Sequence, residues 1–364
     1  MTGKNKFGSA EAVILLAMTM AARIFLSFPA ALMEGANNAA WMTPIGGILV
    51  ALGGVFIMGK LLKQSPEKNI IQITEDTLGA YIGTAVNLVY VIFFLSIATI
   101  FVREFSEKMI TVALPSTPIS IITTGYLIVC LLGAHLGLEV LARAASLTYP
   151  FAAIGVIILL VTLYPAWEFN NIYPLFGGGF YHVFVAGTYK TAAVSEIILV
   201  GLIVQSVGGY KQIFSIGFKA VLLSFSLLII MLFVMNLTHN WRIAKEFAFP
   251  FYRLAKTIYL GVFFQRVEAV YIVIWSFIGI LKIGITLYGA AFSLAESLKL
   301  PDYRPLLWPL TMLIFTGSLL PNDMPTAIYL DSNYLRPGAW IPNYIIPLFL
   351  LLVIRFKGTS KNAK

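Results

Sequence analysis

Apolar stretches of about 20 residues follow one another along the chain, with short polar segments between them. The apolar residues do not alternate with polar ones, so they predict helices rather than the strands of a membrane barrel. A helix of about 20 residues, rising 1.5 Å per residue, crosses the ~30 Å hydrocarbon core of a bilayer. The predicted spans are residues 11–33, 40–62, 81–102, 117–135, 141–164, 188–207, 213–236, 269–294, 305–320 and 341–355. The pattern therefore predicts an all-α integral membrane protein of about ten transmembrane helices.

Composition agrees with a membrane location. Hydrophobic residues make up 59% of the 364 residues and charged residues 11%, and the mean hydropathy is +0.88. A soluble domain is usually about 45–50% apolar and roughly 25% charged. The excess apolar surface must face lipid, where only helices and closed barrels satisfy their backbone groups. We expect residues 1–364 to form a single transmembrane domain.

The net charge of +9 indicates orientation rather than a nucleic-acid partner. If the N-terminus, with Lys4 and Lys6, lies inside, the inner segments carry more Lys and Arg than the outer ones. Trp41, Trp167 and Trp241 then fall near the outer ends of spans, where interfacial tryptophans gather. Both termini are therefore predicted to be cytoplasmic.

Two long amphipathic connections, residues 63–80 and 238–268, suggest an internal repeat. In the second, apolar residues recur at helical spacing while the polar ones lie elsewhere on the wheel, as in an interfacial helix. The apolar set is Phe251, Leu254, Ala255, Ile258 and Val262, and the polar set is Arg253, Lys256 and Gln265. The connections correspond if spans one to five and six to ten are two copies, about 9–165 and 185–357. An odd number of spans inverts the second copy.

Four predicted spans carry polar residues at helical spacing. A charge inside the bilayer costs ~2.5–3.5 kcal/mol on insertion scales, so each needs a reason. The four sets are Arg23 with Ser27; Ser96, Thr99 and Arg103; Ser195 with Glu196; and Lys282 with Thr286. If these faces meet, they form a polar cavity halfway across the bilayer, suited to a small zwitterion such as an amino acid.

Two of these spans are predicted to be interrupted. Pro29 cannot donate its N–H and disturbs the preceding turn, so residues 27–30 are the candidate break in span one. Residues 199–201 are the weaker candidate in span six. An interrupted helix offers free N–H and C=O groups at one place, which suits both ends of a zwitterion.

The buried charges also have structural interpretations. Arg23 and Glu196 either pair with each other or contact a ligand. Lys282 pairs with Glu196, occupies a place where other transporters hold a cation, or snorkels towards the interface. No metal-ligand spacing and no nucleophile–base pair stands out, and Cys130 lies inside an apolar run. We therefore expect no cofactor, no metal and no enzymatic activity.

Several of these features together resemble a known protein family. The features are ten spans, the interrupted Ala22–Pro29 segment, the acid in Ala193-Val-Ser-Glu196, and Pro-Asn-Asp-Met-Pro at 321–325. They are similar to the B subunits of bacterial endospore germination receptors, the GerAB-type spore permeases of the amino acid–polyamine–organocation superfamily. The resemblance implies a LeuT-like core of two inverted five-span repeats. It also implies a germinant sensor in the spore inner membrane that works with an A subunit and a lipoprotein C subunit.

The resemblance further implies where a ligand binds. In this superfamily spans one, three, six and eight line the pocket, which places ligand-binding roles on Ser27, Phe28, Thr99, Glu196, Leu199 and Thr286. By analogy Lys282 replaces a sodium ion with its own charge, and Arg23, Lys282 and Glu196 serve coupling or structure. The expected function is germinant sensing through binding of an amino acid. The alternative is a proton-coupled amino acid transporter.

Overall fold

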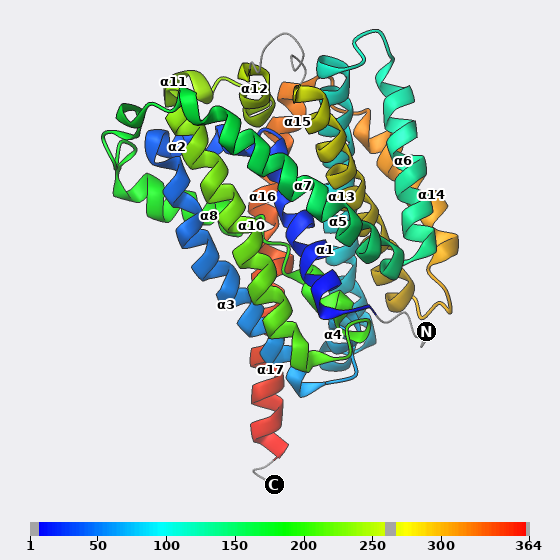
Figure 1. The fold of residues 1–364 in the computed structure, drawn as a ribbon. Helices are drawn as coiled ribbons and strands as arrows, with labels where there is room; N and C mark the ends of the chain where they lie inside the picture. The colour runs from blue at the N-terminus through cyan, green and yellow to red at the C-terminus, as the bar shows by residue number, and fades with distance from the viewer. Residues whose placement is uncertain (1–6, 259–266, 362–364) are drawn as a thin grey trace.

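The computed structural model describes residues 7–258 and 267–361 (Figure 1). Over these ranges the regular structure is entirely helical, which confirms the predicted all-α class. The first half contains α1 (Ser9–Ala21), α2 (Phe28–Ala36), α3 (Thr43–Gln64), α4 (Ile70–Leu78), α5 (Ala80–Val112), α6 (Ile119–Leu136) and α7 (Leu138–Leu163). Short 3-10 helices at Ala22–Phe25, Asn37–Met42, Tyr164–Ala166 and Phe169–Ile172 connect some of them.

The second half contains more irregular helices. Its α-helices are α8 (Gly187–Ala192), α9 (Ile198–Leu202), α10 (Tyr210–Thr238), α11 (Trp241–Ala244), α12 (Pro250–Thr257), α13 (Val267–Ser297), α14 (Arg304–Ser318), α15 (Met324–Leu330), α16 (Arg336–Gly338) and α17 (Ile346–Lys361). A 3-10 turn covers Ile203–Gln205, and π-helical turns cover Tyr181–Ala186, Asp331–Leu335 and Ile341–Ile345.

Local sequence explains several helix boundaries. Gly79 and Gly137 adopt φ angles of 85° and 100°, which an L side chain rarely tolerates, and they stand before α5 and α7. At the start of α4 the Asn69 side chain accepts the Gln72 N–H, and the Gln72 side chain accepts the Asn69 N–H. This capping box satisfies two donors that the helix itself leaves free.

Seven helical stretches in the described residues are long and apolar enough to cross a membrane. They are Phe28–Gln64, Ala80–Val112, Ile119–Leu136, Leu138–Ala166, Tyr210–Thr238, Tyr271–Ser297 and Met324–Lys357. The predicted first and sixth spans are interrupted instead, and α14 has 15 residues. The count of ten crossings therefore stays a prediction.

Helix α7 shows how the molecule meets lipid. Over its most apolar window only 17% is buried. Large apolar side chains project from it, namely Leu147, Phe151, Ile154, Ile157, Ile158 and Val161. Exposure of such an apolar surface to water is unfavourable, whereas contact with lipid acyl chains is not. The outer face of α7 therefore suits a bilayer.

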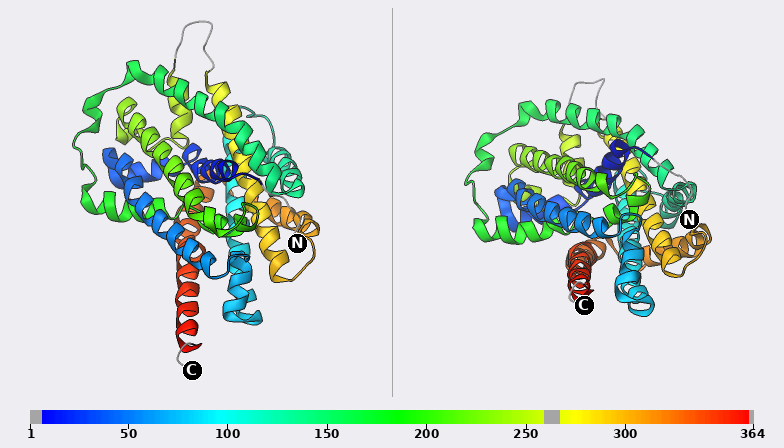
Figure 2. Two further views of the ribbon diagram at one scale, coloured as in Figure 1. Left: turned by 60° about the horizontal axis from the view of Figure 1, so that its bottom comes forward. Right: turned by 90° about the horizontal axis from the view of Figure 1, so that it is seen from below.

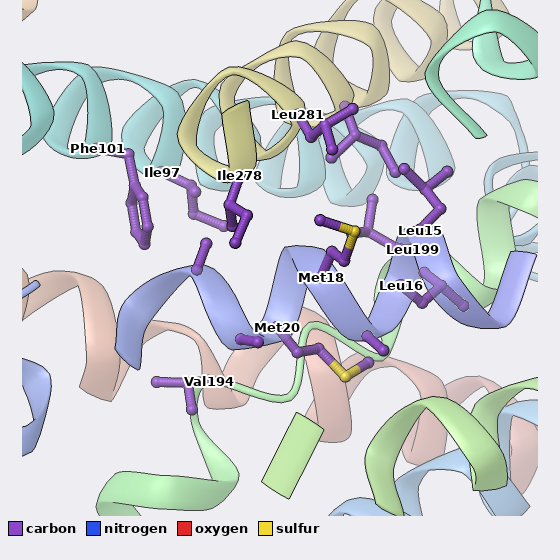
Figure 3. Packing of buried hydrophobic residues seen from close by; sticks show 14 of the residues in the cluster. Leu15, Leu16, Met18, Met20, Ile97, Phe101, Val194, Leu199, Ile278 and Leu281 are labelled. Carbon is purple, nitrogen blue, oxygen red and sulfur yellow. The ribbon is translucent and has the colours of Figure 1, made fainter. Parts of the chain in front are cut away.

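Helix α1 lies inside the bundle, surrounded by α7, α10 and α13 (Figures 1 and 2). Leu15, Leu16 and Met18 of α1 belong to the core that also contains Ile97 of α5 and Ile278 of α13 (Figure 3). Helices α5 and α13 pack along each other beside it. The interrupted first span is thus held on several sides, away from lipid.

Small residues bring the helices on the other side of α1 close together. A Cβ atom on Gly47 of α3 would lie 2.3 Å from Thr191 Oγ1 of α8. One on Gly217 of α10 would lie 2.7 Å from Val55 Cγ1 of α3. Close backbone approach through small residues is the usual way in which membrane helices associate.

The two amphipathic connections each contain a short helix, and these lie at opposite ends of the molecule (Figure 1). Helix α4 buries Ile70, Ile71 and Ile73, and α12 buries Phe251 and Leu254. Helix α12 covers the first part of the predicted interfacial helix. Its predicted continuation through Val262 and Gln265 lies outside the described residues, as do Lys4 and Lys6.

Both ends of the described chain lie at the α4 end of the molecule. The Phe7 N–H donates to the Ser206 carbonyl just before α10 begins, and Lys357 Nζ donates to the Thr77 carbonyl of α4. Figure 1 shows the start of α1 and the end of α17 towards this end. A single side for both termini agrees with the predicted topology, while its assignment to the cytoplasm stays a prediction.

Candidate functional site

Span one is interrupted next to Pro29. The α-helix ends at Ala21, a 3-10 turn follows to Phe25, and Leu26 is extended at φ −109° and ψ −151°. Helix α2 then begins with Pro29 in its first turn. The interruption spans residues 22–27, slightly before the predicted 27–30, because proline tolerates the first turn of a helix and disfavours helical geometry before it.

Span six is interrupted at residues 193–197, between α8 and α9. The predicted break at 199–201 is wrong, since Leu199 and Gly201 lie within α9. Glu196 has φ 46°, in the left-handed region that side chains other than glycine rarely adopt. Such a conformation costs of order 1–3 kcal/mol and persists only where the surroundings hold it.

Lys282 holds Glu196 in that position. Lys282 Nζ donates to Glu196 Oε1 and also to the Thr19 carbonyl at 3.2 Å, and both charged side chains are buried. Of the alternatives for Lys282, the structure places it in an ion pair with Glu196 rather than at the membrane interface. This pair joins α13 and α1 to the interruption in span six.

Arg23 pairs with Asp331 rather than with Glu196. Arg23 Nη1 lies 2.6 Å from Asp331 Oδ1, and Arg336 Nη2 lies 2.5 Å from Asp331 Oδ2. The three side chains are at most 4% exposed. One carboxylate thus neutralises two guanidinium groups and ties the last span to the interruption in span one.

The π-helical turns of the last span place these partners. Asp331 begins the first turn, Asp331–Leu335, and Arg336 follows it. The second turn, Ile341–Ile345, contains Asn343, which accepts the Ile198 N–H at 3.1 Å, and Tyr344, which donates to the Ala192 carbonyl at 2.8 Å. One span therefore contacts both interruptions. Insertions of this kind in helices often mark functional sites.

The start of this span is fixed outside the apolar region. Asp323 caps α15 by accepting the Thr326 N–H at 2.8 Å and the Thr326 hydroxyl at 2.5 Å. These hydrogen bonds stabilise the ionised carboxylate and hold the pKa of Asp323 below its usual value.

Among the described residues, seven buried acidic and basic side chains gather around the two interruptions. They are Arg23, Glu104, Lys108, Glu196, Lys282, Asp331 and Arg336. Glu104 and Lys108, one turn apart on α5, complete the electrostatic network with the triad around Asp331. Four are cations and three are carboxylates. When all are ionised, the cluster carries one positive charge in excess, which an anionic group would neutralise.

The other predicted residues lie at different places. Ser27 precedes the first residue of α2 and is buried, but its side chain makes no capping hydrogen bond, and its Oγ has no partner in the part of the chain that the structure describes. Phe28 packs its ring 4.8 Å from the Arg336 guanidinium carbon. Leu199 is buried near Leu15 and Met18 of α1 (Figure 3).

The two predicted threonines differ from each other. Thr286 is buried one turn beyond Lys282, and its hydroxyl donates to the Lys282 carbonyl at 2.9 Å. Thr99 faces Gly317 of α14 and lines a groove of about 510 Å³ between α5, α14 and the last span. The structure therefore does not bring Thr99 to the charge cluster.

Sequence reasoning missed Glu104, Lys108, Asp331 and Arg336. The predicted third and tenth spans were 81–102 and 341–355, which left these residues in loops. Helix α5 continues to Val112, and the last apolar stretch begins at Met324. These charges lower the local hydropathy, so the predicted apolar spans stop before or after them. The available signal was the spacing of Glu104 and Lys108, which are four residues apart and therefore lie on one helix face.

The space beside the interruptions is small. A cavity of about 10 Å³ lies between Arg23, Phe28 and Val194, about the volume that one water molecule needs. An amino acid at this place would require the surrounding side chains to move. Among the described residues no group of three or more His, Cys, Asp or Glu could hold a metal ion.

Long apolar helices, together with interrupted helices around a buried charge cluster, define a multi-pass membrane protein. The sequence profile described as spore germination protein matches residues 7–326. The chain is 24% identical over 341 residues to spore germination protein KB of Bacillus subtilis (strain 168), covering 88% of each chain. It is 24% identical over 362 residues to spore germination protein YndE of the same organism, covering 97% of each. The chain therefore belongs to the spore germination protein family, as the sequence resemblance predicted.

Proposed function

We propose that this protein senses a germinant by binding a small molecule, an amino acid, between the interruptions of spans one and six. The observation that carries the proposal is the buried cluster, in which basic side chains outnumber acidic ones. When all seven are ionised, four cations face three carboxylates, so a ligand carboxylate restores neutrality where an unpaired charge is costly. The relatives are named spore germination proteins, which supports a role in germination.

The start of α2 suits the ligand carboxylate. Helix α2 has nine residues, and the first N–H groups of a helix lack partners within it and favour anions. The Ser27 hydroxyl stands at this position and is available as a donor. In this proposal Ser27, Phe28, Leu199 and Thr286 line the site, while Arg23, Glu196 and Lys282 set its charge. Thr99 is left out because it faces α14.

The proposed architecture is a LeuT-like pair of inverted repeats. Helices α4 and α12 follow the second span of each half and lie at opposite ends of the molecule, as inversion requires (Figure 1). The first span of each half is the interrupted one. We further propose that the chain acts in the spore inner membrane with A and C receptor subunits, both termini being cytoplasmic.

One observation favours the alternative, a proton-coupled amino acid transporter. Glu196 is bound to Lys282 through Oε1, while its Oε2 has no partner among the described residues. A carboxylate at a helix interruption that shares a cation and keeps one free oxygen can accept a proton. Transporters use such buried acids as proton relays.

The testing experiment measures thermal unfolding of the purified protein against the twenty amino acids, several nucleosides and several sugars. A ligand that binds only the folded state raises the unfolding midpoint with its occupancy. A rise with an amino acid supports the proposed site, and its loss in Arg23→Met locates the site at the cluster. No rise with any amino acid at millimolar concentration, for the protein alone or with its A and C subunits, contradicts it. Uptake of the same amino acid into proteoliposomes would favour the transporter.

A further inference from the structure

Lys108 occupies an aromatic cage. The side chain is fully buried, and its Nζ lies 4.3 Å from the ring centroid of Trp275, 5.1 Å from that of Tyr271 and 5.2 Å from that of Phe249. The same Nζ donates to the Phe25 carbonyl at 2.5 Å. Rings at these distances attract an ammonium ion through their negative faces. Three rings and one carbonyl are thus the recognition elements for a primary ammonium.

The carbonyl in the cage belongs to the interruption of span one. Phe25 ends the 3-10 turn, so its carbonyl lies where regular helical hydrogen bonding is lost. The cage therefore adjoins the proposed ligand site and lies on the side of α12. Phe249 directly precedes α12, which packs against α13 and the 3-10 turn.

Among the described residues, no carboxylate forms an ion pair with Lys108. Glu104 lies one turn away on the same helix, yet no ion pair joins the two in the described residues, and Glu104 Oε1 has no hydrogen-bond partner there. Tyr271 Oη and Trp275 Nε1, on two of the cage walls, are also buried without a partner in the described chain. The cage thus contacts the Lys108 ammonium through neutral groups. The Tyr271 hydroxyl and the Trp275 N–H remain as hydrogen-bond donors for a ligand.

We propose that this cage is an ammonium-binding site in which Lys108 is a tethered occupant that a ligand amine displaces. The incoming ammonium takes the rings and the Phe25 carbonyl, and Lys108 moves to the free oxygen of Glu104. The Tyr271 hydroxyl and the Trp275 N–H offer donors to an acceptor group on the same ligand. The site therefore takes a primary amine that also carries a hydrogen-bond acceptor, the chemistry of an amino acid. The exchange part of this inference rests on the proposed function, whereas the cage itself does not.

The first experiment tests the cage by chemical rescue of Lys108→Ala. Alanine retains Cβ, so propylammonium supplies the three missing carbons and the charge. We expect Lys108→Ala to unfold at a lower temperature than the wild type, and propylammonium chloride to restore several degrees in a saturable way. Propan-1-ol with matched sodium chloride lacks the charge and should restore nothing. The exposed Lys211→Ala is the matched control and should respond to neither.

The result holds even if the alanine variant folds poorly. In that case the measured quantity is the yield of monodisperse protein extracted with or without propylammonium. Recovery with propylammonium and not with propan-1-ol supports the cage. Equal values in both additives overturn it, and so does a Lys108→Met variant that matches the wild type in unfolding midpoint, since an ammonium would then be dispensable.

The second experiment tests the exchange. For any amino acid that raises the wild-type midpoint, Glu104→Gln should weaken binding at least tenfold, because Lys108 loses its second partner. Glu107→Gln, on the same helix and paired with Arg103, should leave binding within twofold. Equal effects of the two variants overturn the exchange. If propylammonium rescues Lys108→Ala but no amino acid raises the wild-type midpoint, the cage stands and the proposed function is contradicted. Failure of the cage and failure of the proposed function therefore give different results.

Discussion

At the scale of single residues, Asp331 has the largest expected effect on stability. Its carboxylate is 2% exposed and faces two buried guanidinium groups. Asp331→Asn leaves both Arg23 and Arg336 without a counter-charge, and breaking a buried pair in this way costs about 3–5 kcal/mol. We expect a large fall in the thermal unfolding midpoint of the purified protein.

The matched control is Asp76→Asn. Asp76 pairs with Lys68 at 2.6 Å, but the two side chains are 53% and 49% exposed. Exposed pairs contribute about 0.2–1 kcal/mol, so this change should barely alter the midpoint. Equal midpoints for the two variants would show that the Asp331 triad does not hold spans one and ten together.

The buried pair of Lys282 and Glu196 makes a second prediction about single residues. Lys282→Met should abolish the response to ligand while the protein remains in the membrane, because Glu196 loses the cation that orients it. Glu196→Gln alone leaves Lys282 without its carboxylate. The double variant removes both charges, so it should be more stable than the sum of the single effects by about 0.5–3 kcal/mol. Additive unfolding free energies, or an unchanged dose response in Lys282→Met, would contradict this account.

Leu199 tests the other wall of the proposed site. It is 1% exposed beside α1, so Leu199→Trp overpacks this region and should prevent ligand binding. A thermal shift with the ligand measures the effect. Normal ligand binding by Leu199→Trp would move the proposed site away from span six.

Single residues also show what the sequence could predict of the site. Arg23, Glu196 and Lys282 were predicted because each interrupts an apolar run, and a charge there needs a reason. Which charge pairs with which could not be read from spacing, because their partners lie on helices far apart in the sequence. The partner of Arg23, for instance, is 308 residues away.

At the scale of helices, the contact between α3 and α8 depends on glycine. A side chain at Gly47 would collide with Thr191 and with the Phe225 ring. Gly47→Val should therefore push α8 outward and destabilise the protein by about 1–3 kcal/mol, the usual cost of overpacking. Gly53→Val on the same helix meets no atom within 4 Å and is the control. Similar unfolding midpoints for both variants would show that α8 tolerates displacement.

The two helix interruptions show which boundaries a sequence pattern can predict and which it cannot. Pro29 indicated the interruption in span one because a proline constrains the backbone locally. The interruption in span six carries no proline or glycine between residues 193 and 197, and contacts from Lys282, Asn343 and Tyr344 stabilise it. Tertiary contacts of this kind leave no local pattern, so the predicted position was six residues late at its start, 199 rather than 193.

At the scale of the whole molecule, the class was predictable because the bilayer imposes it. Run length and the lack of alternation identified the helices, and the interfacial helix predicted in the second amphipathic connection contains α12. The long last stretch, Met324–Lys357, was predicted as only 341–355, since Asp331 and Arg336 lower its local hydropathy. The same charges that hide this span from a hydropathy pattern hold the interruption of span one.

The orientation of the whole molecule gives the last prediction. Lys211 lies at the start of α10, next to the described N-terminal residues, whereas Phe169 lies beyond α7, near the end of α10. With cytoplasmic termini, Phe169→Cys faces outward and Lys211→Cys faces inward. The single native cysteine, Cys130, is 1% exposed, so the unmodified chain supplies an unlabelled background. In intact bacterial cells a membrane-impermeant maleimide should label Phe169→Cys, and Lys211→Cys only after permeabilisation. The opposite labelling would show that the orientation is the reverse of the predicted one. Helix α12 and the aromatic cage would then lie on the cytoplasmic side, away from a germinant that arrives from outside.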